Sequence, residues 1–114
     1  MTQLTINLIQ GSVSFNFTNS AGEKLKQEIN NLMQSLKEIP LQAKTGGKPK
    51  RYQSMEYQYT GDVFLEIFCN PNIYPNPFAA KLLITLRDEK IRLTSEAELT
   101  RLIEDLEQFL LANQ

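Results

Sequence analysis

Hydrophobic and polar residues alternate with a period of two along residues 3–18, which predicts two β-strands that each bury one face. Gly11 and Ser12 lie where the chain must turn between the two strands. The apolar positions are Leu4, Ile6 and Leu8 in the first strand, and Val13, Phe15 and Phe17 in the second.

The pattern then changes to the period of an amphipathic helix. Ser20 can accept a hydrogen bond from the first helical turn while Glu23 reaches back, which is the capping-box pattern, so we expect the helix to begin there. Pro40 should end the helix, because the residue before a proline is pushed out of helical geometry. The apolar stripe consists of Leu25, Ile29, Leu32, Met33 and Leu36.

The C-terminal third of the chain repeats this plan. A strand with Leu82, Ile84 and Leu86, a turn at residues 88–90 and a second strand with Ile91 and Leu93 precede a second capping box, Ser95 to Glu98. Strand, turn, strand and helix therefore occur twice, which leaves open both a duplicated ββα unit and two independent uses of a common unit. The second helical stripe is Leu99, Leu102, Ile103, Leu106, Phe109 and Leu110.

A hairpin at residues 52–69 lies between the two copies and turns at the sequence YTGD. A two-residue loop, Gly61-Asp62, would place Met55 and Tyr57 on the face of Phe64 and Phe68. A three-residue loop, Tyr59-Thr60-Gly61, would place them with Val63, Leu65 and Ile67, because one residue of register moves every side chain to the other face. We favour the three-residue loop, which gives one coherent apolar face and uses Gly61 in the left-handed position.

These elements predict a single α+β domain over residues 1–114. The expected architecture is a two-layer sandwich in the order ββα-ββ-ββα. An antiparallel sheet of about six strands would carry two helices on one face.

The composition excludes several classes of protein. No apolar run approaches the about 20 residues of a membrane span, and the N-terminus carries no positive charge ahead of its apolar residues, so we expect neither a span nor a signal peptide. The chain has no histidine and one cysteine, which excludes Ser-His-Asp and Cys-His catalysis. We expect no metal or cofactor, and a cytoplasmic location.

Two weak candidates for chemistry favour a structural interpretation. Cys69 shares a face with Leu65 and Ile67, and a free cysteine on an apolar face is usually a small hydrophobic residue of the core. Glu56 and Glu66 lie on neighbouring strands and could form a carboxylate pair. Two glutamates on a solvated sheet face are far more often only solvent-exposed charges.

Residues 43–52, AKTGGKPKRY, form a basic stretch that contains Lys44, Lys48, Lys50 and Arg51. The other residues carry 8 basic (12 − 4) against 13 acidic side chains, a net charge of −5. The stretch lacks the spacing and the strand-to-helix context of a phosphate-binding loop. It is interpreted as a solvated linker, or as a contact for nucleic-acid phosphates with Tyr52 stacking on a base.

Residues 69–78, CNPNIYPNPF, place three apolar side chains, Ile73, Tyr74 and Phe78, in a proline-stiffened loop. They either close one end of the core or anchor a partner. Phe64 and Phe68 point away from the helices if Leu65 and Ile67 face them, and aromatic residues on an uncovered sheet face indicate an interface.

The sequence therefore predicts a non-enzymatic interaction or regulatory module that contacts another protein or a second copy of itself. Its predicted partner-binding residues are Phe64, Phe68, Ile73, Tyr74 and Phe78. The alternative is a nucleic-acid-binding protein that uses Lys44, Lys48, Lys50, Arg51 and Tyr52.

Overall fold

The computed structural model describes residues 2–45 and 51–113, except for the side chains of residues 42–45. The predicted order ββα-ββ-ββα is present, with two short 3₁₀ helices, η1 and η2, inserted before β5. The elements are β1 (Gln3–Asn7), β2 (Ser12–Asn16), α1 (Asn19–Thr45), β3 (Met55–Thr60), β4 (Phe64–Cys69), η1 (Pro71–Ile73), η2 (Pro77–Ala79), β5 (Lys81–Arg87), β6 (Arg92–Glu98) and α2 (Leu99–Ala112).

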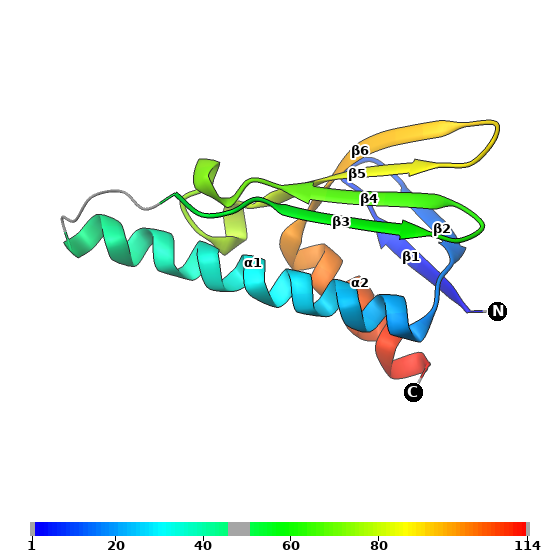
Figure 1. Ribbon diagram of the computed structural model, residues 1–114, viewed down its shortest axis with the longest axis horizontal. Coiled ribbons are helices and arrows are strands. Elements are labelled where there is room, and N and C mark those ends of the chain that lie inside the picture. The colour runs from blue at the N-terminus through cyan, green and yellow to red at the C-terminus, as the bar shows by residue number, and fades with distance from the viewer. Residues whose placement is uncertain (1, 46–50, 114) are drawn as a thin grey trace.

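The α+β class is confirmed, but the expectation of one six-stranded sheet is wrong. The strands form two antiparallel sheets, a hairpin of β1 and β2 and a four-stranded sheet in the order β3-β4-β5-β6. Figure 1 shows α1 running along β3, while α2 and the β1–β2 hairpin cross behind the sheet. The backbone of Ile9 donates to the carbonyl of Glu96 over 2.9 Å, so the hairpin meets β6 near its turn without extending the sheet.

The β1–β2 hairpin can lie outside the four-stranded sheet because its apolar face is buried in the same core. Leu4, Ile6 and Phe15 belong to one buried cluster with the inward side chains of the four-stranded sheet. The Phe17 ring stands edge-on to the rings of Tyr59 and Phe109, at centroid distances of 4.7 and 5.5 Å. Burial of one face is all that strand alternation requires, and either arrangement of the hairpin satisfies it.

Both helices bury the stripes that the sequence predicts. The fully or nearly fully buried leucines at the centre are Leu25, Leu32 and Leu36 of α1 and Leu99, Leu102 and Leu106 of α2. At the start of α1, the hydroxyl of Tyr57 on β3 donates to the carbonyl of Ala21 over 3.1 Å.

The β3–β4 hairpin has the predicted facing but a different loop. Tyr57 pairs with Ile67 and Thr60 with Phe64, so the loop is residues 61–63 instead of 59–61. Gly61 does not adopt a positive φ. A Cβ at Gly61 would instead collide with the side chain of Tyr59, and that close approach is the reason for a glycine here.

The predicted boundaries of both helices need correction. The hydroxyl of Thr18, not Ser20, accepts the first-turn N–H of Ala21 over 3.1 Å. Pro40 lies inside α1 instead of ending it, although its ring cannot donate the usual backbone hydrogen bond. Ser95 is part of β6 and pairs with Ile84, so the second capping box does not form.

The turn between β5 and β6 forms as the sequence predicts. The carboxylate of Asp88 accepts the backbone N–H groups of Lys90 and Ile91 over 2.8 and 2.9 Å. These hydrogen bonds, first Ile91 and then Lys90, hold the pKa of Asp88 below its ordinary value.

A buried carboxylate joins α2 to the edge of β1. Asp105 accepts the backbone N–H and the side-chain amide of Asn7, both over 2.8 Å. The guanidinium of Arg101, one turn earlier on α2, lies 3.5 Å from the same carboxylate. Asp105 therefore satisfies a backbone group that the β1 edge would otherwise leave unpaired.

Candidate functional site

The face of the four-stranded sheet turned away from the helices carries three cross-strand rows of side chains. The strand register places residues opposite one another in each row. We name them the acidic row (Glu56, Phe68, Leu83 and Glu96), the middle row (Gln58, Glu66, Thr85 and Thr94) and the basic row (Thr60, Phe64, Arg87 and Arg92).

Phe64 and Phe68 lie on this open face, as the facing of Leu65 and Ile67 implied. Phe68 and Leu83 are direct neighbours on β4 and β5, with 36% and 42% of their surfaces exposed. Sequence reasoning missed Leu83, although the inward alternation of Leu82 and Ile84 already implied its outward direction. Two adjacent apolar side chains among charged ones form a small hydrophobic centre on the face.

Charges of opposite sign occupy the two ends of the face. The guanidinium of Arg87 lies over the ring of Phe64, 4.5 Å from its centroid, and Arg92 pairs with Arg87 in the same row. At the other end, Glu56 stands opposite Phe68 and Glu96 opposite Leu83. The face therefore has a positive end, a polar middle row and a negative end that contains the apolar pair Phe68 and Leu83.

The two candidate carboxylates of this face are not paired with each other. Glu66 accepts a hydrogen bond from the amide of its cross-strand neighbour Gln58 over 3.0 Å, whereas Glu56 lies in the next row. The amide partner supports the interpretation of Glu66 as a solvated surface residue.

The proline-rich segment is ordered by its asparagines. The side chain of Asn70 accepts the N–H of Asn72 over 3.1 Å at the start of η1. Asn72 in turn receives the N–H of Tyr52 over 2.8 Å and donates to its carbonyl over 2.7 Å. This pair of bonds imitates a strand contact and ties the segment to the entry of β3.

The apolar residues of this segment have different environments. Tyr74 packs against the core, and its hydroxyl donates to the carbonyl of Lys81 over 3.2 Å. Ile73 and Phe78 project from the two short helices, with 66% and 85% of their surfaces exposed. Phe64 and Phe68 share the open face, but Ile73 and Phe78 belong to a different part of the surface, because η1 packs on α1 and η2 on both helices.

The structure describes only part of the basic stretch, residues 43–52. Lys48 and Lys50 lie outside the described residues, and of Lys44 only the backbone, in the last turn of α1, is described. Arg51 is exposed. Tyr52 is enclosed, with 8% of its surface exposed, so its ring does not offer a face for stacking on a base. Burial, and after it the carboxylate of Glu38, raises the pKa of Tyr52.

Cys69 is a core residue, with 2% of its surface exposed. Burial raises the pKa of its thiol from 9.0 to about 11. At neutral pH the side chain is protonated and shielded, which is the opposite of a reactive thiolate.

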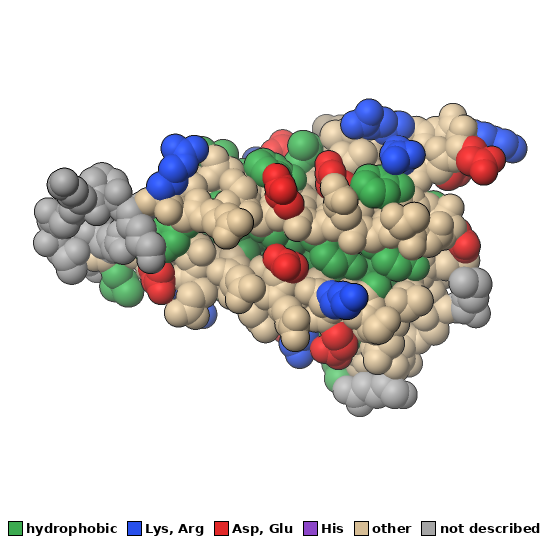
Figure 2. Space-filling view, viewed as in Figure 1, with side chains coloured by type: hydrophobic (Ala, Val, Ile, Leu, Met, Phe, Trp, Pro, Cys, Tyr) green, Lys and Arg blue, Asp and Glu red, His purple; other side chains and the backbone are tan. Residues whose placement is uncertain are grey.

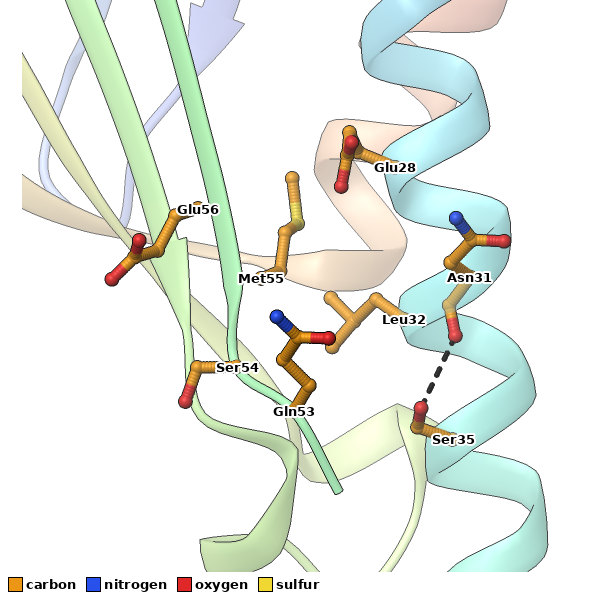
Figure 3. A pocket seen from close by; sticks show the side chains of 8 residues that line it. All are labelled: Glu28, Asn31, Leu32, Ser35, Gln53, Ser54, Met55 and Glu56. Carbon is orange, nitrogen blue, oxygen red and sulfur yellow. Dashed lines mark hydrogen bonds between the residues drawn. The ribbon is translucent and has the colours of Figure 1, made fainter.

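Within the described residues, grooves lie on both sides of α1. One, of about 530 Å³, lies between α1 and the edge strand β3 (Figure 3). Figure 2 shows hydrophobic side chains gathered between the helix and the sheet, with acidic side chains beside them. The other, of about 270 Å³, lies between α1 and α2 over Ile29, Met33 and Ile103, with Lys26 and Lys37 at its rim. Neither groove was predicted, because the residues of each come from segments far apart in the sequence.

Within residues 2–45 and 51–113, no group of three or more Cys, Asp and Glu side chains is arranged to hold a metal ion. In the same part of the chain, neither helix combines the length and apolarity needed to cross a bilayer. No protein-family model, curated protein or solved structure matches the chain.

Proposed function

We propose that the protein is a non-enzymatic interaction module that self-associates through the open face of its four-stranded sheet. The observation that carries this proposal is the pattern of that face: a basic row at one end and, at the other, an acidic row that holds the apolar pair Phe68 and Leu83 between Glu56 and Glu96. A surface that is complementary to itself after a two-fold rotation favours a symmetric dimer.

The acidic and basic rows meet this condition, whereas the middle row faces itself and brings Glu66 of the two copies together. A two-fold axis along the middle row turns the acidic row of one copy toward the basic row of the other. Glu96 then faces Arg92 of the second copy, and Phe68 faces its Phe64. Because the operation is symmetric, each of these contacts occurs twice, so four charges and four aromatic rings pair at once.

The size of the face predicts a weak dimer. Four strands about 4.8 Å apart and about six residues long cover roughly 400 Å². Stable interfaces bury about 800 Å² on each partner. Association should therefore depend on concentration in the micromolar range and fall with ionic strength, since the charged pairs lie at the rim.

A charge-reversal pair tests the arrangement. Arg92→Glu and Glu96→Arg each bring like charges together twice in a homodimer, so each variant alone should sediment as a monomer. An equimolar mixture restores opposite charges at both sites and should sediment as a heterodimer. Sedimentation velocity and light scattering measure all three samples, and the wild type provides the reference.

Lys90→Glu is the matched control, because it changes charge by the same amount on the β5–β6 turn, outside the three rows. Its self-association should equal that of the wild type. Phe68→Ser should weaken the dimer by removing an aromatic contact. A wild type that stays monomeric at all accessible concentrations, or two variants that fail to combine, would refute self-association through this face.

A further inference from the structure

The edge strand β3 presents unpaired backbone groups. β3 pairs with β4 on one side only. The N–H of Gly61 donates to the carbonyl of Val63 over 3.0 Å, which fixes the alternation along the hairpin. By that alternation, the backbones of residues 55, 57 and 59 bond to β4. The N–H and C=O groups of Glu56, Gln58 and Thr60 point to the free edge.

The start of the free edge, at Met55 and Glu56, opens into the groove between β3 and α1. Figure 3 shows Met55 and Leu32 extending into this gap from the strand and the helix, with Glu28 above them on α1. Glu56 lies on the opposite side of β3, on the open face of the sheet. The charged residues that line the groove, Glu28 and Glu56, are both acidic. Two nearly buried apolar side chains on the floor, a bare strand edge and negative charge therefore meet at the Met55–Glu56 end of β3.

From this geometry we propose a second binding surface, at the edge of the sheet beside the dimer face, with which it shares Glu56. An extended segment of another protein adds to β3 as a fifth strand, hydrogen-bonded to the outward backbone groups of Glu56, Gln58 and Thr60. Side chains of such a segment alternate between the two faces of the sheet. Apolar ones contact Leu32 and Met55 in the groove, and basic ones lie beside Glu56 on the open face.

The partner is therefore a segment that alternates apolar and basic residues. A second copy of β3 is a poorer occupant, because its sequence, MEYQYT, offers no basic side chain to Glu28 and Glu56. Helix α1 provides no hydrogen-bond partners for the outward backbone groups of β3, since its own backbone groups are bonded within the helix. The groove also leaves room for side chains of the added strand, with a volume of about 530 Å³.

The test uses a fluorescein-labelled peptide of about eight residues that alternates valine and lysine, long enough to span β3. Fluorescence anisotropy should show saturable binding to the wild type. A peptide that alternates valine and glutamate should bind at least about tenfold more weakly. A valine–lysine peptide N-methylated at every second amide, on the edge that would meet β3, should not bind, because it keeps the charge but loses the backbone donors.

Two protein variants complete the test. Gln58→Pro removes an N–H that points to the free edge and leaves the backbone bonds to β4 intact, which an edge strand tolerates. Both this variant and Gln58→Thr lose the side-chain bond to Glu66, so that loss is matched between them. Gln58→Pro should abolish peptide binding, whereas Gln58→Thr should preserve it, and circular dichroism checks that both are folded. Glu56→Gln should weaken binding of the lysine peptide without affecting the fold, so the test does not depend on the proline variant.

Equal binding of the N-methylated peptide would overturn strand addition and leave only charge attraction. No saturable binding of the lysine peptide would overturn the proposal as a whole. If Gln58→Pro dissociates the dimer and Arg92→Glu does not, the free edge of β3 binds a second copy of the protein. That result would refute the peptide partner.

Discussion

The thiol of Cys69 shows how one buried position fixes the chemistry of a residue. The side chain is enclosed in the core, so a thiol reagent should label it at the rate at which the protein unfolds. A stopped-flow or mass-spectrometric labelling experiment, with and without urea, measures this. Rapid labelling of the native protein would contradict the assignment of Cys69 to the inward face of β4.

The same residue predicts a pH dependence of stability. Burial raises the thiol pKa from 9.0 to about 11, so the unfolded chain ionises before the folded one. The contribution of the protonated Cys69 thiol to the stability of the folded protein is complete below pH 9.0 and is lost as pH rises toward 11. The free energy of unfolding should fall by up to about 1.4 kcal/mol per pH unit in this window.

Urea denaturation of wild type and Cys69→Ala, at pH values below and above 9.0, isolates the effect of the thiol. The variant should lose less stability over this range, because it has no thiol to ionise. Tyr57, whose pKa burial raises from 10.0 to about 12, gives both proteins a further loss at higher pH. Identical slopes in the two proteins would show that the thiol does not titrate differently on unfolding.

At the scale of elements, Asp105 is the contact that joins α2 to β1. Asp105→Ala removes both acceptors of Asn7 and leaves a partly buried backbone N–H unpaired. The loss of a charged hydrogen bond and the unsatisfied group together should lower the free energy of unfolding by about 2–4 kcal/mol. Chemical denaturation followed by circular dichroism measures it.

Asp62→Ala is the matched control for this prediction. Asp62 also accepts a hydrogen bond from an asparagine, the side chain of Asn16, over 2.7 Å, but at an exposed site. Its removal should change stability by less than about 0.5 kcal/mol. A similar cost for the two variants would mean that the bond to the β1 backbone contributes nothing beyond an ordinary surface contact.

Element boundaries and sheet membership mark the limit of what the sequence predicts. Alternation identified each strand and its buried face, because burial of one face depends on local spacing alone. It did not determine which sheet the β1–β2 hairpin joins, since Leu4 and Ile6 are buried in either arrangement. Pro40 was expected to end α1, but the helix continues past it to Thr45, because a proline weakens a helix without forbidding it.

The candidate site was predictable to the same extent. Phe64 and Phe68 were placed on the open face from the facing of their neighbours, and Leu83 follows from the same alternation. The complementary rows and the groove beside β3 depend on the pairing of strands and on how α1 lies along the sheet. Glu28 and Glu56 are separated in the sequence by residues 29–55, so no local pattern could have brought them together.

For the whole molecule, the uneven distribution of charge is the feature that distinguishes a protein partner from a nucleic-acid partner. Residues 44–51 carry four basic side chains, whereas the rest of the chain has a net charge of −5. At most about four phosphates could be neutralised, which gives a slope of roughly −3 to −4 in log K against log salt. Tyr52 adds no stacking surface, since it is enclosed. We therefore expect any affinity for single-stranded DNA or RNA to be weak and to fall by roughly 100-fold when the salt concentration rises fourfold.

Titration of labelled single-stranded DNA and RNA at two salt concentrations measures this slope. The comparison is with a variant in which Lys44, Lys48, Lys50 and Arg51 are all changed to glutamine. Residual binding that the variant retains would locate the nucleic-acid contact elsewhere on the surface. Tight binding that persists at the higher salt and disappears only in the variant would favour nucleic acid over a protein partner. Such a result would make the basic stretch, and not the open face of the sheet, the functional surface.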